Sequence, residues 1–314
     1  MPGRVDPLGV VEAAYALHVP QRQWLQEIAD AARPALDTGR GVFCAAYDAT
    51  DPERLRVEEA VGAGMPQYAV DLVRLGAQSS GTGIISEVRW QSCGMLSEMV
   101  TPAQLADIPL LSFARRAIGV ADLLGLNAAD PTLRGVAFCA PSEAPMTVAP
   151  GFKHTWARVA AHIAAGLRLR RQLAATPALT DGAEAILDPG GALQHATGEA
   201  KGPEHRVALR AATVALDKAR TAALRRSEPD RALDLWQALV QGRWSLVDHF
   251  ERDGRRFLVA RRNDPAVEGS RLTERERQVI GFACLGHSNK LIAYELGLAV
   301  STVAACLSSA RRKL

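Results

Sequence analysis

The last 44 residues of the chain carry a series of helix start and stop signals that constrain their local structure more than any other part of the sequence. Thr273 and Glu276 have the spacing of a capping box, in which each side chain bonds a free backbone amide at a helix start. Gly286 is placed to end this helix in the left-handed conformation. Ser288 can cap a second helix, and Gly297 can end it. The pattern therefore predicts two short consecutive helices.

A third helix is expected after a turn at residues 298–300, and its last residues are Arg311, Arg312 and Lys313. Apolar residues recur at helical spacing through all three segments, which indicates one small helical core. Two short helices joined by a tight turn containing Gly are typical of a helix-turn-helix, whose second helix enters the major groove of DNA. The residues predicted to point inward are Leu272, Val279, Ile280, Ala283, Cys284, Leu291, Ile292, Leu296, Val303, Leu307 and Ala310.

These residues resemble the DNA-binding domain of the LuxR/FixJ class of bacterial transcription regulators. The strings LTERERQV, GHSNKLIAYELG and STV, with the final RRKL, match its three helices over about one-seventh of the chain. The resemblance implies a regulator whose N-terminal part senses a signal and whose C-terminal part binds double-stranded DNA as a homodimer. The DNA-contacting residues would be Ser288, Asn289, Lys290, Ser301, Thr302, Val303, Arg311, Arg312 and Lys313.

Three features depart from this family. Ala304 and Cys306 stand where members often carry Lys and His, so two polar side chains that face DNA are missing. Ala299 replaces a capping Ser, and Ser301 is expected to cap the third helix half a turn later. The sequence stops at Leu314, before the usual fourth helix, so we expect the small domain to rely on neighbouring structure or on DNA.

Charge placement supports a polyanionic partner. Residues 271–314 hold seven basic and three acidic residues, a net charge of +4, whereas the other 270 residues sum to −1. A basic end on a nearly neutral body suggests nucleic acid. We expect phosphate contacts to supply most of the affinity, with modest sequence selectivity. The alternative is a ligand- or protein-binding regulator whose degenerate helix-turn-helix no longer binds DNA.

Composition excludes several classes of protein. The chain is 48% hydrophobic and 23% charged, but no apolar run approaches the ~18 residues of a membrane span. The N-terminus lacks the basic region followed by an apolar region that is typical of a secretory signal sequence. A cytoplasmic, soluble protein is expected. The five cysteines are scattered without a Cys-x-x-Cys pair, so neither a zinc site nor a disulfide framework is predicted. No catalytic constellation or cofactor motif is found, so we do not expect an enzyme.

Residues 1–175 predict a mixed α+β domain that resembles the GAF sensor fold with flanking helices. The expected elements are helices at 15–37 and 152–173, the latter with the stripe Trp156, Val159, Ile163 and Leu167, and strands at 41–49, 55–64, 119–126 and 134–141. Both of these long helices carry apolar stripes that are wide enough to serve a core and a dimer contact.

A ligand pocket in this GAF-like domain has only weak candidates. Core packing explains them equally well, and the ligand stays unknown. Cys93 has the most loop-like surroundings and is the best candidate for a redox-sensitive thiol. The candidates are Cys44, Tyr47, Cys93, Met95 and Cys139.

A break at 175–184 precedes a second module at 184–262 that resembles a small PAS domain, although a linker domain without ligand explains it equally. We expect a hairpin over 185–197, helices at 204–226 and 229–240, and a hairpin with its turn at Asp253-Gly254. A polar linker at 263–270 leads to the helix-turn-helix of 271–314. The predicted fold class is therefore α+β multidomain with an all-α C-terminus.

Overall fold

The structure is a computed structural model of the chain. It describes residues 6–51, 54–79, 92–101, 103, 111, 114–116, 119–174, 183–236, 239–240, 243–250, 255–263 and 272–314. The chain divides into two compact units, Met1–Leu167 and Arg168–Leu314. The expected break at 175–184 and the linker at 263–270 lie almost wholly outside the described residues.

The first unit is built on a five-stranded antiparallel sheet with the strand order β2-β1-β5-β4-β3. Its strands are β1 (Val42–Asp48), β2 (Arg56–Ala63), β3 (Cys93–Met95), β4 (Asp122–Ala129) and β5 (Arg134–Ser142). Its helices are α1 (Pro7–Ala14), α2 (Gln21–Leu36), α3 (Gln67–Ser79), α5 (Leu96–Met99) and α8 (Pro150–Ala174), which continues into the second unit.

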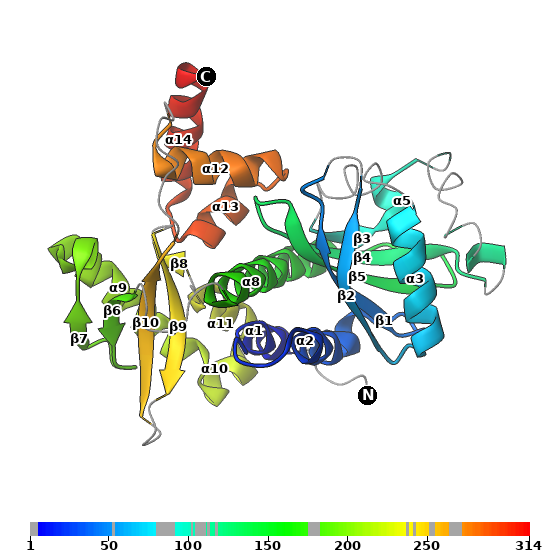
Figure 1. Cartoon of the computed structure of the whole chain (residues 1–314), viewed down its shortest axis with the longest axis horizontal. Coiled ribbons are helices and arrows are strands. Elements are labelled where there is room, and N and C mark those ends of the chain that lie inside the picture. Colours follow the sequence, from blue (N-terminus) through cyan, green and yellow to red (C-terminus); the bar gives the residue numbers. More distant parts are fainter. Residues whose placement is uncertain are drawn as a thin grey trace. The chain divides into compact units, whose positions relative to one another are not determined.

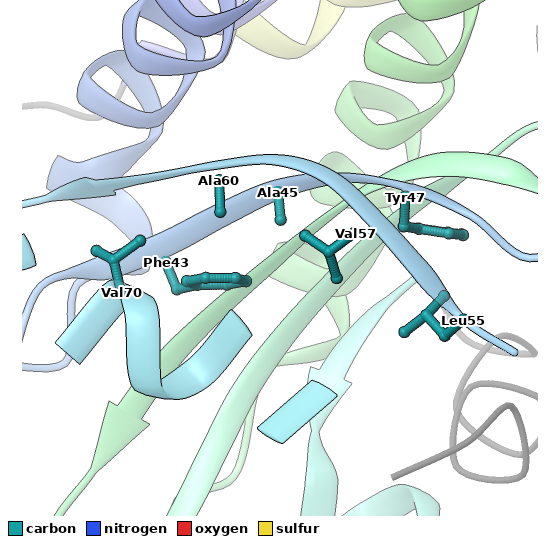
Figure 2. Packing of buried hydrophobic residues seen from close by; sticks show 7 residues of the cluster. All are labelled: Phe43, Ala45, Tyr47, Leu55, Val57, Ala60 and Val70. Carbon is teal, nitrogen blue, oxygen red and sulfur yellow. The ribbon is translucent and has the colours of Figure 1, made fainter. Parts of the chain in front are cut away.

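Both faces of this sheet are covered, which explains why every residue of β1 is buried. On one face, Phe43, Ala45 and Tyr47 form a cluster with Val57 and with Val70 of α3 (Figure 2). Helix α2 packs against β1 and β2 with its buried apolar stripe, which includes Trp24 and Ile28. The alternation of side chains along β1 thus serves two separate cores.

Helices α1, α2 and α8 meet at the end of α1. The backbone carbonyl of Ala14 accepts a hydrogen bond from the indole Nε1 of Trp24 at 3.0 Å. Gly166 of α8 approaches the same carbonyl so closely that a Cβ atom there would lie 2.3 Å from its oxygen. The hydroxyl of Tyr15 lies 3.2 Å from Nδ1 of the buried His162. Glycine is therefore required where α8 approaches the end of α1.

The predicted elements of this unit are largely confirmed. The helix expected at 15–37 begins only at Gln21, because Pro20 precedes it and a separate helix, α1, lies before it. The strand expected at 119–126 lies at Asp122–Ala129. The long helix and its buried stripe of Trp156, Val159, Ile163 and Leu167 are confirmed.

The second unit contains another five-stranded antiparallel sheet, with the order β7-β6-β10-β9-β8. Numbered within each sheet, both sheets have the same order, second-first-fifth-fourth-third. Its strands are β6 (Ala183–Leu187), β7 (Leu193–Ala196), β8 (Leu239–Val240), β9 (Trp244–Phe250) and β10 (Arg256–Arg262). Between β7 and β8 come η1 (Gly198–Lys201), α9 (Pro203–Ala219), α10 (Ala222–Ser227) and α11 (Pro229–Leu235).

Two helix predictions in this module are wrong in extent. The helix expected at 204–226 is broken at Arg220, whose guanidinium lies over the ring of Trp236 and donates to Asp248 at 2.9 Å. The helix expected at 229–240 ends at Leu235, and Leu239 and Val240 form the edge strand β8 instead. Both hairpins are confirmed, although the turn at Asp253-Gly254 lies outside the described residues.

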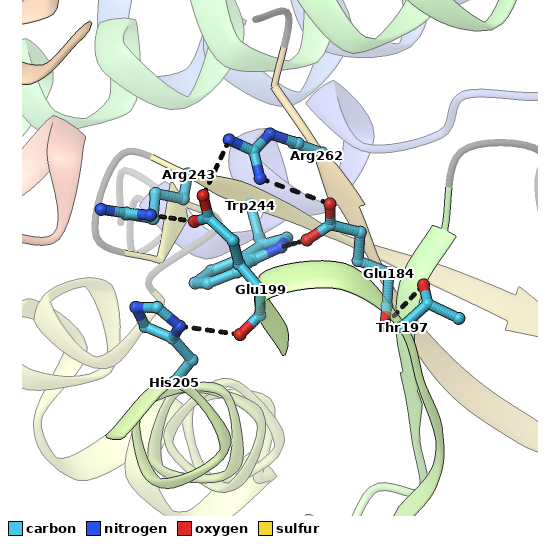
Figure 3. A network of polar contacts seen from close by, with 7 residues as sticks. All are labelled: Glu184, Thr197, Glu199, His205, Arg243, Trp244 and Arg262. Atoms are coloured by element: carbon cyan, nitrogen blue, oxygen red, sulfur yellow. Dashed lines mark hydrogen bonds and ion pairs between the residues drawn. The ribbon is translucent and has the colours of Figure 1, made fainter. Parts of the chain in front are cut away.

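A network of charged side chains ties this module together around the buried Trp244 (Figure 3). Glu184 accepts from the Trp244 indole at 2.8 Å and from Arg262 at 3.4 Å. Glu199 of η1 accepts from Arg262 at 3.3 Å and also pairs with Arg243. These contacts join β6, η1, β9 and β10, so the arginines of this cluster are committed to structure.

Three helices follow at the C-terminal end of the second unit, namely α12 (Glu274–Cys284), α13 (Asn289–Leu296) and α14 (Val300–Lys313) (Figure 1). Among the described residues, no single helix is long and apolar enough to cross a membrane. In the part of the chain that the structure describes, α13 and α14 taken together meet such a test by length and composition, but they are sharply bent relative to each other.

The buried His162 generates a prediction about acid sensitivity. Burial, aided by the charge of Arg158, lowers the pKa of His162 from 6.5 to about 3. Between these two pH values His162 is protonated in the unfolded chain but not in the folded unit. The free energy of unfolding therefore decreases as pH falls from 6.5 towards 3. We expect His162→Gln to flatten this loss, measured as the pH dependence of amide exchange protection in α8.

The matched control is His195→Gln, because His195 is an exposed histidine on β7. This variant should keep the acid sensitivity of α8 unchanged. An equally steep loss of α8 protection in His162→Gln and in the wild type between pH 6.5 and 4 would contradict the prediction.

Candidate nucleic-acid interface

Helix α12 starts at the predicted capping box. The Thr273 hydroxyl accepts from the amide of Glu276 at 3.2 Å, and the Glu276 carboxylate accepts from the amide of Thr273 at 2.8 Å. The helix ends before Gly286, which has a positive φ of 78°. Because the left-handed conformation costs most residues free energy, glycine favours this ending.

Helix α13 is bounded by the residues that the sequence indicated. The Ser288 hydroxyl caps it by accepting from the amide of Leu291 at 3.3 Å. Gly297 ends it in the left-handed conformation, at φ 60° and ψ 43°, and the amide of Leu298 returns to the carbonyl of Ala293 at 2.8 Å. This closing pattern turns the chain within three residues.

Helix α14 then leaves at 107° to α13, within the range of a helix-turn-helix. Ala299 is its N-cap and makes no side-chain capping bond. The expectation that Ser301 caps the helix is wrong, because α14 already begins at Val300 and Ser301 lies exposed inside its first turn. Losing a capping side chain costs about 1 kcal/mol, which the packing of α14 against α12 and α13 offsets.

The small core of the three helices is mostly the predicted one. Val279, Ile292, Leu296, Val303 and Ala310 are buried, as expected. Leu272, Ile280, Ala283, Leu291 and Leu307 are only half-buried, and Cys284 is exposed. Phe282 and Leu285 are buried instead. Both are apolar and lie next to the predicted core positions 283 and 284, which is the sequence signal that could have identified them.

A buried carboxylate connects the beginning of α12 with the end of α14. The Nζ atom of Lys313 lies 2.7 and 2.8 Å from the two carboxylate oxygens of Glu276, whose side chain is only 6% exposed. The hydrogen bond from Lys313 lowers the pKa of Glu276 from 4.5 to about 2. The predicted DNA contact Lys313 is therefore engaged in holding α14 in place.

The other predicted cations are exposed at the two outer ends of the motif. Lys290 lies in the first turn of α13 beside the exposed Ser288 and Asn289. Arg311 and Arg312 lie in the last turn of α14. Within residues 272–314 and the rest of the described chain, none of these three cations has a carboxylate partner. Lys290 also meets the free amides and positive dipole of a helix N-terminus, a combination that suits a phosphate oxygen.

The exposed face of α14 carries small side chains along most of its length. Ser301, Ala304, Ala305 and Ser308 are all exposed and recur at the spacing of one helix face, which continues to Arg311 and Arg312. Thr302 is half-buried. Val303, which was also predicted to contact DNA, is fully buried in the core on the opposite side of α14, so it does not belong to this exposed face.

A family model described as bacterial regulatory proteins, luxR family, GerE, matches residues 270–314. This segment is a LuxR-family helix-turn-helix domain. The search of curated proteins found no match to the chain. The matched segment coincides with the three helices, so the family is established for this part of the chain.

The LuxR-family domain also contacts the module that precedes it in the second unit. The hydroxyl of Tyr294 on α13 donates to the carbonyl of Leu233 on α11 at 2.8 Å. Helix α13 also packs near β8. Between α12 and α13, His287 stacks on Phe282 and lies 3.1 Å from the buried Glu295. Neighbouring structure thus supports this small domain, as its limited core suggested.

The weak ligand candidates of the first unit do not converge on one pocket. Cross-strand partners place Cys93, Leu126, Phe138 and Cys44 in one row on one face of the sheet, and Met95 shares that face with Cys93. Tyr47 and Cys139 face the opposite side, next to Phe43 and α3. The five residues therefore cannot line a single cavity.

The cysteines of this unit do not have the properties of redox sensors. Burial raises the pKa of Cys93 to about 12 and that of Cys139 to about 11, so both thiols stay protonated. Cys93 is also buried in β3 and does not lie in a loop, which disfavours a redox-sensitive thiol there. Within the described part of the chain, no group of three His, Cys, Asp or Glu side chains could hold a metal ion.

Glu276 provides a test of how α14 is held. Glu276→Gln keeps an acceptor for the capping box but loses the charge that binds Lys313. We expect faster amide exchange at residues 310–314 and a lower urea midpoint for the domain at pH 7. Because the folded pKa lies below the unfolded value, the wild-type stabilisation is present above pH 4.5 and is lost as pH falls towards 2.

Glu274→Gln is the matched control, since it removes a carboxylate from the same first turn and the same helix dipole. It should leave the exchange of residues 310–314 unchanged. The arrangement would be refuted if both variants loosened the end of α14 equally.

Proposed function

We propose that the chain is a transcription regulator whose LuxR-family domain binds promoter DNA. The observation that carries this proposal is the angle of 107° between α13 and α14, which is typical of a helix-turn-helix. The segment matches the luxR family model, and its Lys290, Arg311 and Arg312 are exposed. Helix α14 has 14 residues, about 21 Å at the usual rise, which is long enough to lie along a major groove. The exposed cations would contact phosphates on either side of it.

We propose further that the sheet domain of the first unit is a GAF-like sensor and that the second sheet belongs to a PAS-like module. Their mixed α+β composition and shared strand order support this reading. Regulators with this DNA-binding motif commonly read two half-sites as dimers, which makes a homodimer part of the proposal. A signal at the sensor would then bias how the two recognition helices are presented.

The exposed surface of α14 favours affinity over selectivity. A bidentate contact with a base is worth ~1–3 kcal/mol, and the short side chains of Ser301, Ala304, Ala305 and Ser308 offer at most single hydrogen bonds or methyl contacts. Phosphate contacts give an affinity that falls steeply with salt. Binding should therefore be salt-dependent and modest in its preference among sequences.

Removing the exposed cations tests the proposal directly. Each of Lys290→Ala, Arg311→Ala and Arg312→Ala should weaken binding to all duplexes alike and reduce the slope of log affinity against log salt by about 1 per lost phosphate contact. The measurement is fluorescence anisotropy with labelled duplexes selected from a random pool, over a range of salt concentrations.

Arg226→Ala is the control, because Arg226 is an exposed arginine on α10, outside the domain. It should leave the salt slope unchanged. If the wild type selects no duplex, or if the three variants bind like the wild type, the function is that of a protein- or ligand-binding regulator with a degenerate helix-turn-helix. The small exposed face of α14 is the feature that favours this second candidate.

Restoring a long side chain on α14 should strengthen DNA binding. Ala304 is exposed, and Lys is a good helix former, so Ala304→Lys fits the fold. We expect tighter binding and a steeper salt slope than in the wild type. The neutral variant Ala304→Gln serves as its control for side-chain length, and an unchanged affinity in Ala304→Lys would argue against α14 facing DNA.

A further inference from the structure

The first two turns of α14 carry an exposed face without long polar side chains. We name it the α14 reading face and define it as Val300, Ser301, Ala304 and Ala305. Val300 is 45% exposed although it is a large apolar residue, and Ala304 lies one turn after it on the same side. The core of the domain is filled from the other side of the helix, by Val303. The methyl groups of the reading face are therefore available to a partner.

A helix-turn-helix arrangement would place this face at the bases of DNA. In such a motif the N-terminal residues of the second helix contact base edges, and the first helix crosses the backbone. The match of residues 270–314 to the luxR family supports this arrangement for α13 and α14. At 1.5 Å per residue, Arg312 lies about 10 Å beyond Ala305 along α14, close to the ~12 Å width of the major groove. The reading face would thus meet bases while Arg312 reaches a phosphate at the groove edge.

The side chains of α14 exclude most kinds of direct base reading. Bidentate contacts use Arg or Lys for guanine and Asn or Gln for adenine, and Asp or Glu accept from cytosine. None of these residue types occurs from Val300 to Ala310. A methyl group packed on a polar base edge would leave that edge without a hydrogen-bond partner, which costs free energy. Among the four ordinary bases, only thymine presents an apolar group in the major groove, its C5 methyl.

We propose, building on the proposed DNA binding of the LuxR-family domain, that the α14 reading face recognises the C5 methyl groups of thymine. Val300, Ala304 and Ala305 would pack against these methyl groups and exclude water from them. Each buried methyl group contributes about a fourfold gain in affinity. The preferred target is therefore duplex DNA with thymines at fixed positions in each half-site, and the preference at any single position is modest.

The first test changes the DNA by one methyl group at a time. The probe is a labelled duplex that the full chain selects from a random pool, and we expect selected duplexes to share thymines at fixed positions. Deoxyuridine pairs like thymidine and keeps the O4 acceptor but lacks the C5 methyl. Replacing one shared thymidine by deoxyuridine should weaken binding about fourfold in anisotropy titrations. Replacing a thymidine outside the shared positions is the control and should leave the affinity unchanged.

The second test separates the methyl group from the hydrogen-bonding groups of the base. Changing a shared T·A pair to C·G removes the methyl group and replaces the O4 acceptor by an amino donor. Changing it to 5-methylcytosine paired with guanine makes the same exchange but keeps the methyl group. Because the reading face offers methyl groups at this position, the methylated duplex should bind about fourfold more tightly than the unmethylated one.

The third test changes the protein and compares the same two duplexes, with thymidine or deoxyuridine at one shared position. Val300→Ser and Ala305→Gly each remove methyl groups from the reading face, and the affinity ratio of the two duplexes should fall from about four towards one in at least one of them. A variant that is less well folded binds both duplexes less, so its ratio is unaffected by the loss of folded protein. Lys290→Ala is the control, because a lost phosphate contact should weaken both duplexes alike and leave the ratio unchanged.

Three results would overturn the recognition of thymine methyl groups while DNA binding itself stands. The selected duplexes could share no thymine, the wild type could bind thymidine and deoxyuridine duplexes equally, or both Val300→Ser and Ala305→Gly could keep the full ratio. If the wild type selects no duplex at all, the proposed function and this recognition fail together, and the exposed Val300 then belongs to a protein-binding surface. Salt-dependent binding without any effect of the methyl group would thus be distinguishable from a complete loss of DNA binding.

Discussion

The carboxylate of Glu276 is the constraint on which the C-terminal domain depends. It accepts from the amide of Thr273 at one helix start and from the ammonium of Lys313 at the far end of α14. The glycine-ended turn sets the other end of α14 at 107° to α13. A small domain with few core residues thus obtains a defined orientation of α14 from one buried carboxylate, its ion pair with Lys313 and one turn. The exposed face of α14 is what this scaffold presents.

Basic residues in the second unit fall into two classes according to their partners. Some arginines, such as Arg243 and Arg262 around Trp244, neutralise carboxylates and hold strands together. Others, such as Arg311 and Arg210, have no carboxylate partner in the part of the chain that the structure describes. Since a paired charge offers little to a second anion, only the latter class is available for binding. Net charge alone does not distinguish the two classes.

The two sheets show how far a shared plan determines function. They have the same strand order and helices inserted between the second and third strands, yet their side chains serve different purposes. In the first unit, apolar residues on both faces make a buried sheet, and the pleat separates Cys44 from Cys139. In the second, an ion-pair network surrounds one tryptophan. Strand order describes the scaffold, and the sites depend on the residues placed on it.

The sequence by itself determined the local features of this protein. Caps, glycines and apolar spacing define α12 and α13 closely, because these signals act within a few residues, and strand patterns located both hairpins. It did not place the break at Arg220 or the engagement of Lys313, since each depends on a partner 16 or more residues away: Trp236 and Asp248 for Arg220, and Glu276 for Lys313. It also did not place the edge strand β8, because pairing with Trp244 and Ser245 of β9 replaced the helix that the local pattern indicated. Tertiary structure decided which cations are committed and which face of each strand or helix is buried, because periodicity shows that a stripe exists and not what it meets.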